Sequence, residues 1–115
     1  MAKIAVVEDN DAMREQLCGF IAQYARESGR QLDVTAFADG AEIVDPYRPG
    51  FDIIFLDIEM PTLGGMPTAE RIRQVDPDVV LVFVTNMAQY AIRGYEVDAL
   101  DFVLKPVSYY QFSTK

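Results

Sequence analysis

Acidic, hydroxyl and basic side chains follow several apolar runs of this chain, each near the point where the run ends. They are Glu8, Asp9, Asp57, Thr85 and Lys105. A carboxylate at the end of a buried strand is costly to desolvate unless it is paired, bound to a metal or used in chemistry. Parallel strands present their carboxyl ends at one edge of a sheet, where open α/β folds bind ligands. Three acids, one hydroxyl and one cation at such an edge predict a site for Mg2+ and a phosphoryl group.

The elements that must position these residues are short apolar runs that alternate with helical patterns. Strands are predicted at 3–7, 32–37, 52–57, 79–84 and 101–104. Helices are predicted at 11–27, in a short segment after Asp39, in a segment that begins near Pro67, at 88–96 and from about 107 onward. Continuous hydrophobic central strands between helices predict a parallel sheet covered on both faces, with right-handed crossovers and a doubly wound topology.

Capping residues and apolar spacing define the first three helices more closely. Asn10 or Asp11 is predicted to cap the first helix. Its inward face is predicted to carry Met13, Leu17, Phe20, Ile21 and Tyr24. The sequence at 39–42, Asp-Gly-Ala-Glu, predicts a capping box for the second helix. Pro67 suits the first turn of the third helix. That helix is predicted to turn Ala69, Ile72 and Val75 inward.

Length, charge and composition exclude several classes of function. The chain has 115 residues, which fits one domain, and a net charge of -8 from 10 basic and 18 acidic residues. This charge argues against direct binding of nucleic acid and favours a basic protein partner or a divalent cation. No stretch approaches the roughly 20 apolar residues of a membrane span. The single cysteine, Cys18, excludes a disulfide framework and favours the reducing cytoplasm. The absence of histidine excludes Ser-His-Asp and Cys-His catalysis and His-ligated zinc.

The order of these features resembles the receiver domain of two-component response regulators, over essentially the whole chain. The segments that carry the resemblance are Glu8-Asp9, residues 56–61, Thr85 and residues 101–106. Residues 59–61 and 90–106 most resemble receivers that precede a LytTR-type DNA-binding domain. The resemblance implies a flavodoxin-like five-stranded parallel sheet in strand order 2-1-3-4-5. With the fifth helix truncated at Lys115, residues 1–115 are expected to form a single receiver domain, the N-terminal fragment of a longer regulator.

The resemblance also implies a role for each site residue. Asp57 is expected to accept a phosphoryl group from a sensor histidine kinase. Mg2+ is the expected cofactor, with ligands from Glu8, Asp9, Asp57 and the backbone carbonyl of Glu59. Thr85 and Lys105 are expected to contact phosphoryl oxygens, and Thr85 is expected to form a switch together with Phe102. Positive charge at the site is needed because a carboxylate that attacks a phosphoryl group faces repulsion.

The same resemblance implies how the domain acts on its partners. It is not expected to be an enzyme, since it catalyses only its own phosphorylation and dephosphorylation. Phosphorylation is expected to change the face made by the predicted fourth helix at 88–96, the fifth strand at 101–104 and the fifth helix from about 107 onward. This change is expected to control a C-terminal output domain that binds DNA and regulates transcription, and to promote a homodimer. The receiver itself is expected to bind neither nucleic acid nor membrane.

Two other readings of the site remain open from the residues alone. A Mg2+-dependent phosphohydrolase of the haloacid dehalogenase type has a strand-end acid pair like that at 57–59, but its second acid should be aspartate and it carries a cap domain. A receiver-like interaction module could have lost phosphorylation. Locally, residues 8–11 could be only an acidic helix start favoured by the helix dipole, and Phe102 could be static core. A flavin-binding fold of this topology is disfavoured because Glu8-Asp9 would repel its phosphate.

Overall fold

Five parallel strands form one sheet in the order β2-β1-β3-β4-β5 in a computed structural model that describes residues 2–57, 60, 62–85 and 101–104. The strands are β1 (Ala2–Val7), β2 (Leu32–Phe37), β3 (Ile53–Leu56), β4 (Val80–Thr85) and β5 (Asp101–Leu104). The helices are α1 (Asp11–Ser28), α2 (Gly40–Val44) and α3 (Gly65–Val75). The predicted flavodoxin-like sheet and its strand order are confirmed. The helix predicted at 88–96 and the truncated fifth helix lie outside the described residues.

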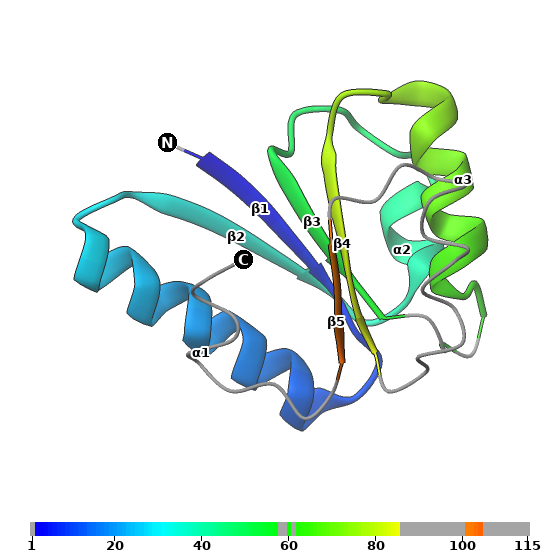
Figure 1. Ribbon diagram of the computed structural model, residues 1–115. Coiled ribbons are helices and arrows are strands. Elements are labelled where there is room, and N and C mark those ends of the chain that lie inside the picture. The colour runs from blue at the N-terminus through cyan, green and yellow to red at the C-terminus, as the bar shows by residue number, and fades with distance from the viewer. Residues whose placement is uncertain (1, 58–59, 61, 86–100, 105–115) are drawn as a thin grey trace.

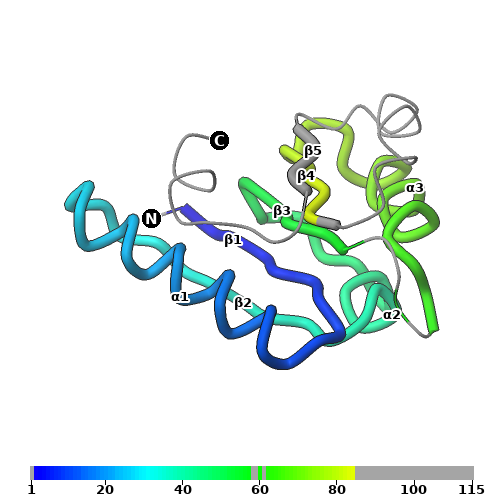
Figure 2. Tube along the Cα trace, turned by 60° about the horizontal axis from the view of Figure 1, so that its bottom comes forward, coloured from blue at the N-terminus to red at the C-terminus, as the bar shows by residue number. Residues whose placement is uncertain are grey.

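The sheet is covered by α1 on one face and by α2 and α3 on the other (Figures 1 and 2). Successive side chains of a strand point to opposite faces, so each central strand contributes to two cores. Val6 and Phe55 pack with Leu17 of α1. Val7 and Leu56 pack in the other core, which also contains Met66, Ala69 and Ile72 of α3. Among the described helices, none is long and apolar enough to cross a membrane.

The first helix begins where its sequence pattern predicts, and four residues of its predicted inward face, Met13, Leu17, Phe20 and Ile21, pack in the core. Asn10 is its N-cap, and its side-chain oxygen accepts a hydrogen bond from the backbone N–H of Met13 at 2.9 Å. Leu17 and Ile21 are buried against the sheet. The helix ends at Gly29, whose φ of 72° lies in the left-handed region that glycine adopts at low cost. Because only residues 8–10 separate β1 from α1, the first turn of α1 lies at the carboxyl edge of the sheet.

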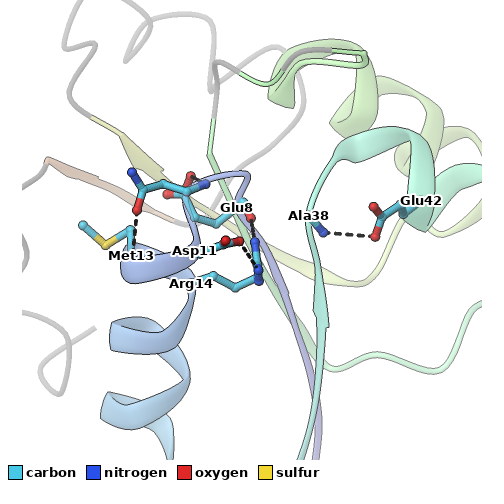
Figure 3. Close-up of polar contacts among 7 residues, drawn as sticks. Glu8, Asp11, Met13, Arg14, Ala38 and Glu42 are labelled. Atoms are coloured by element: carbon cyan, nitrogen blue, oxygen red, sulfur yellow. Dashed lines mark hydrogen bonds and ion pairs between the residues drawn. The ribbon is translucent and has the colours of Figure 1, made fainter.

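Asp39 joins the start of α2 to the segment before α3. Its buried carboxylate accepts hydrogen bonds from the backbone N–H groups of Ala41 at 3.0 Å and of Thr62 and Leu63 at 2.9 Å each. Burial alone would raise the pKa of this carboxyl, but the three backbone donors favour the charged form and lower its pKa below the usual value. Glu42 accepts a hydrogen bond at 3.0 Å from the N–H of Ala38, the residue before the N-cap (Figure 3). The predicted capping box therefore forms with a different backbone donor.

Gly40 allows α2 and α3 to approach each other closely. A Cβ atom at this position would lie 2.4 Å from the carbonyl oxygen of Leu63 and 1.9 Å from Oγ1 of Thr68. Thr68 is fully buried, and its hydroxyl donates to the carbonyl of Gly64 at 2.7 Å. Because the Leu63 carbonyl is backbone, it cannot move aside as a flexible side chain could. Glycine is therefore required here for steric reasons.

The prediction that Val75 turns inward is wrong. Ala69 and Ile72 are fully buried as predicted, but Val75 is 56 % exposed. At about 100° per residue, Val75 lies roughly 120° around the helix from Ala69, beyond the stripe that faces the sheet. Two successive steps of three residues therefore place the second side chain outside the buried face of the helix. Val75 is also the last residue of α3, next to its C-cap Asp76.

Replacing Asp39 by alanine is expected to lower the free energy of unfolding by about 2 kcal/mol at neutral pH, because an N-cap and charge-assisted hydrogen bonds are lost together. Since the folded pKa of Asp39 is lowered, its stabilisation is present above the unfolded pKa of about 3.9 and is lost as pH falls through the folded value. The difference between the parent and Asp39→Ala should therefore shrink in acid.

Urea unfolding followed by circular dichroism at pH 7 and at about pH 3 measures both effects. Asp33→Ala, at an exposed position of β2, is the control and should change stability by less than about 0.5 kcal/mol. Equal stability of Asp39→Ala and the parent at pH 7 would contradict the role of this anchor.

Candidate functional site

The ends of β1 and β3 bring two acidic residues to the same edge of the sheet. The parallel register pairs Val7 with Leu56, the last residues of the two strands. The backbone N–H of Asp57 donates to the carbonyl of Val7 at 3.0 Å, and that of Glu8 donates to the carbonyl of Phe37 at 3.0 Å. Hydrogen bonding thus continues one residue beyond each strand and fixes the backbones of Glu8 and Asp57.

Three carboxylates meet at this edge. Oxygens of Glu8, Asp9 and Asp57 all lie within 4.8 Å of one another. Glu8 is 1 % exposed and Asp57 is 7 % exposed, whereas Asp9 is exposed. Two ionised groups this close repel each other by roughly 3 kcal/mol at an effective dielectric constant of about 20. The cluster therefore favours a bound cation.

The turn between β1 and α1 is held by a set of hydrogen bonds (Figure 3). Glu8 Oε2 accepts from the backbone N–H of Asn10 at 3.2 Å. The guanidinium of Arg14 donates to the backbone carbonyl of Glu8 at 2.9 Å and forms an ion pair with Asp11. These contacts fix the residues on both sides of Asp9, whose carboxylate is exposed at the rim of the cluster.

The donor set of the cluster fits Mg2+. This cation takes oxygen ligands, and it is commonly bound through one or two carboxylates while it retains several waters. Glu8 and Asp57 supply buried oxygens, and Asp9 supplies an exposed one. The cluster is thus open to solvent on the Asp9 side, where water ligands could be accommodated. These residues would hold the cation, which when bound would supply positive charge beside Asp57.

The other predicted site residues are placed less completely. Thr85 is the last residue of β4, and Phe102 pairs in register with Phe83 between β4 and β5. Their side chains are not among those that the structure describes. Glu59 and Lys105 lie outside the described residues. The structure therefore brings together Glu8, Asp9 and Asp57, while the roles assigned to all seven residues stay predictions.

Two residues that support this region were not singled out from the sequence. Asp39 was read only as a helix cap, and its bonds to Thr62 and Leu63 link positions 23 and 24 residues away. Arg14 was not assigned any role. One signal was available, because a cation close to a helix N-terminus is disfavoured by the helix dipole and needs a compensating partner. Asp11, three residues earlier, is such a partner.

Comparisons with known proteins agree on one family. A family model described as the response regulator receiver domain matches residues 4–114. Sensory transduction protein LytT of Bacillus cereus is 32 % identical over 108 residues, which are 92 % of this chain and 42 % of that protein. Transcriptional regulatory protein YpdB of Escherichia coli is 30 % identical over 106 residues, which are 90 % of this chain and 41 % of that protein. The chain thus spans about two fifths of the length of these relatives.

A solved structure gives the same result. The response regulatory domain of protein mrkE from Klebsiella pneumoniae superposes with a TM-score of 0.85 at 28 % sequence identity. The superposition covers 97 % of this chain and 89 % of that chain. The architecture around the acidic cluster is therefore shared with a solved regulatory domain.

Adding Mg2+ is expected to raise the melting temperature, because a cation that binds only the folded cluster stabilises it by mass action. Asp57→Asn should reduce this gain, since it removes one charged ligand and part of the repulsion that the cation relieves. Differential scanning calorimetry at increasing MgCl2 concentration measures the effect. The control is Asp33→Asn, which removes an exposed charge near the start of β2, at the opposite edge of the sheet from the cluster, and should leave the gain unchanged. An equal gain in Asp57→Asn and the parent would refute the metal site.

Proposed function

The chain belongs to the response regulator receiver domain family, and from this we propose that Asp57 is the residue that accepts the phosphoryl group. The observation that carries the proposal is the set of carboxylate oxygens of Glu8, Asp9 and Asp57 within 4.8 Å of one another at the carboxyl edge of the sheet. Asp57 is nearly buried, and its backbone is tied to β1, so its carboxylate is held in place for reaction.

The proposed chemistry is a single phosphoryl transfer. A carboxylate oxygen of Asp57 forms a bond to phosphorus, and the bond from phosphorus to the imidazole nitrogen of a kinase phosphohistidine breaks, with its electron pair left on that nitrogen. The product is an acyl phosphate. Mg2+ would supply the positive charge that offsets repulsion between the carboxylate and the phosphoryl group. Its proposed ligands are Glu8, Asp9, Asp57 and the backbone carbonyl of Glu59.

Two further residues complete the proposed site. Lys105 would neutralise the carboxylates before transfer and a phosphoryl oxygen afterwards. Thr85, at the end of β4, would donate its hydroxyl to another phosphoryl oxygen. Together with Phe102 it would form the switch that reports phosphorylation. The domain would catalyse only its own phosphorylation and dephosphorylation, in the cytoplasm, with no separate substrate that it turns over.

The proposed partners follow from the family and from the lengths of the relatives. A sensor histidine kinase would be the phosphoryl donor. The relatives are more than twice as long as the segment that matches, and one is named as a transcriptional regulatory protein. We therefore propose a C-terminal output domain that binds DNA and regulates transcription. The net charge of -8 supports a receiver that does not itself bind nucleic acid.

Incubation with acetyl phosphate and Mg2+ should give one acyl phosphate per chain, measured as a mass increase of intact protein. Asp57→Asn should abolish this increase, whereas Asp33→Asn should retain it. Continuous release of inorganic phosphate over many turnovers would instead indicate a phosphohydrolase. No modification of the parent, with Mg2+ bound, would indicate a receiver-like module that has lost phosphorylation.

Beryllofluoride with Mg2+ should promote association through the face that helix four, β5 and helix five are proposed to form, because a local charge event can shift a two-state element and change a distant surface. Lys105→Ala should reduce this response while Asp57 stays modifiable, since the cation supplies most of the compensating charge. Analytical ultracentrifugation of the full-length regulator measures the association. The proposal for Lys105 fails if Lys105→Ala associates as strongly as the parent does.

A further inference from the structure

We propose that Arg14 is a positioning residue for the acidic cluster: it holds the turn that carries Glu8 and Asp9, and so sets the affinity and the selectivity of the site for Mg2+. This inference rests on the proposed function only for the identity of the cation. Arg14 does not contact the cluster carboxylates through any bond described for it. Its action would pass through the backbone of Glu8 and the side chain of Asp11.

The guanidinium of Arg14 connects the end of β1 to the start of α1. One nitrogen donates to the backbone carbonyl of Glu8 at 2.9 Å, and another pairs with Oδ1 of Asp11 (Figure 3). The side chain of Arg14 is 22 % exposed, so most of it is withdrawn from water. The planar fork of arginine can serve two acceptors at a fixed separation, which the single ammonium of lysine cannot do.

The same turn is closed by three further hydrogen bonds. Asn10 donates its backbone N–H to Glu8 Oε2 at 3.2 Å and accepts from Met13 N–H at 2.9 Å through its side chain. The backbone N–H of Arg14 donates to the carbonyl of Asn10 at 2.9 Å. Asp9 lies between Glu8 and Asn10, whose positions these bonds hold. The direction of its side chain therefore depends on the turn that Arg14 connects to α1.

The positive charge of Arg14 lowers the affinity of the cluster for Mg2+, whereas its proposed positioning of the turn raises that affinity. A positive charge near Glu8 repels a second cation, so removal of that charge alone would tighten Mg2+ binding. The position is also costly for an isolated cation, because Arg14 lies four residues after the N-cap of α1. The ion pair with Asp11 offsets the cost at the helix start, and the bond of Arg14 to the carbonyl of Glu8 gives this residue a geometric role that its charge alone does not explain.

Arg14→Lys and Arg14→Gln separate the two effects. If Arg14 positions the turn, both variants should weaken Mg2+ binding by about tenfold, since residues that orient metal ligands commonly change affinity on this scale. If Arg14 acts by charge alone, Arg14→Lys should bind as the parent does and Arg14→Gln should bind more tightly. Either of these results would overturn the proposal, as would unchanged affinity in both variants.

The dissociation constant is measured by titrating MgCl2 into unphosphorylated protein and following backbone amide chemical shifts of residues 8–14. Arg26→Lys, in the last turn of α1, is the matched control and should leave the constant unchanged. Asp11→Asn, which weakens the other end of the fork, should give a smaller loss in the same direction. A thermal melt of each variant without Mg2+ shows that it is folded.

Selectivity provides a readout that general destabilisation would not change. Mg2+ requires near-ideal octahedral geometry, whereas Ca2+ accepts flexible geometry. A loosened turn should therefore lower the preference for Mg2+ over Ca2+ in Arg14→Lys, and an unchanged ratio would contradict the proposal. Acyl phosphate formation at saturating Mg2+ is measured in parallel. Failure of the parent to form it refutes the proposed function, while the cation titration still tests Arg14.

Discussion

The simultaneous pairing of β1 with β2 and β3 is the constraint on which the acidic edge depends. The first residue after β1, Glu8, donates its N–H to the carbonyl of Phe37 in β2. The first residue after β3, Asp57, donates its N–H to the carbonyl of Val7 in β1. A slip of the β1–β3 register by one residue would turn Val6 and Val7 to the wrong cores and would move Asp57 away from Glu8. The two hydrophobic cores therefore determine the alignment of the carboxylates.

Buried acids in this domain are stabilised in two different ways. Asp39 is surrounded by three backbone N–H donors, which satisfy its charge and lower its pKa, so it has a structural role. Glu8 also accepts one backbone N–H, that of Asn10, but its oxygens and those of Asp57 approach the oxygens of a third carboxylate. These buried acids thus differ in the groups that surround their carboxylates. Backbone donors create a permanent anchor, whereas neighbouring carboxylates create a site that favours a bound cation.

The sequence was sufficient to predict the elements whose patterns are local. The five strands and the first three helices were predictable because long apolar runs and capping residues such as Asn10 act within a few positions, whereas the strand order was implied by the family resemblance. Convergence of Glu8, Asp9 and Asp57 followed from parallel topology. The contacts of Asp39 with Thr62 and Leu63 and of Gly40 with Thr68 were not predictable, because they depend on how α2 and α3 approach each other in three dimensions. Val75 was misassigned because helical spacing was followed one step too far.

The carboxylate of Asp39 attaches the backbone at residues 62 and 63 to the start of α2. Thr62 and Leu63 follow Asp57 by five and six residues, and their backbone N–H groups are held to the start of α2 by charge-assisted bonds to Asp39. A side chain at position 40 would meet the Leu63 carbonyl and Thr68 on the same side. Residues 62 and 63 cannot move away from α2 without removing donors from a buried carboxylate, so a displacement of this backbone would leave a buried charge without compensation.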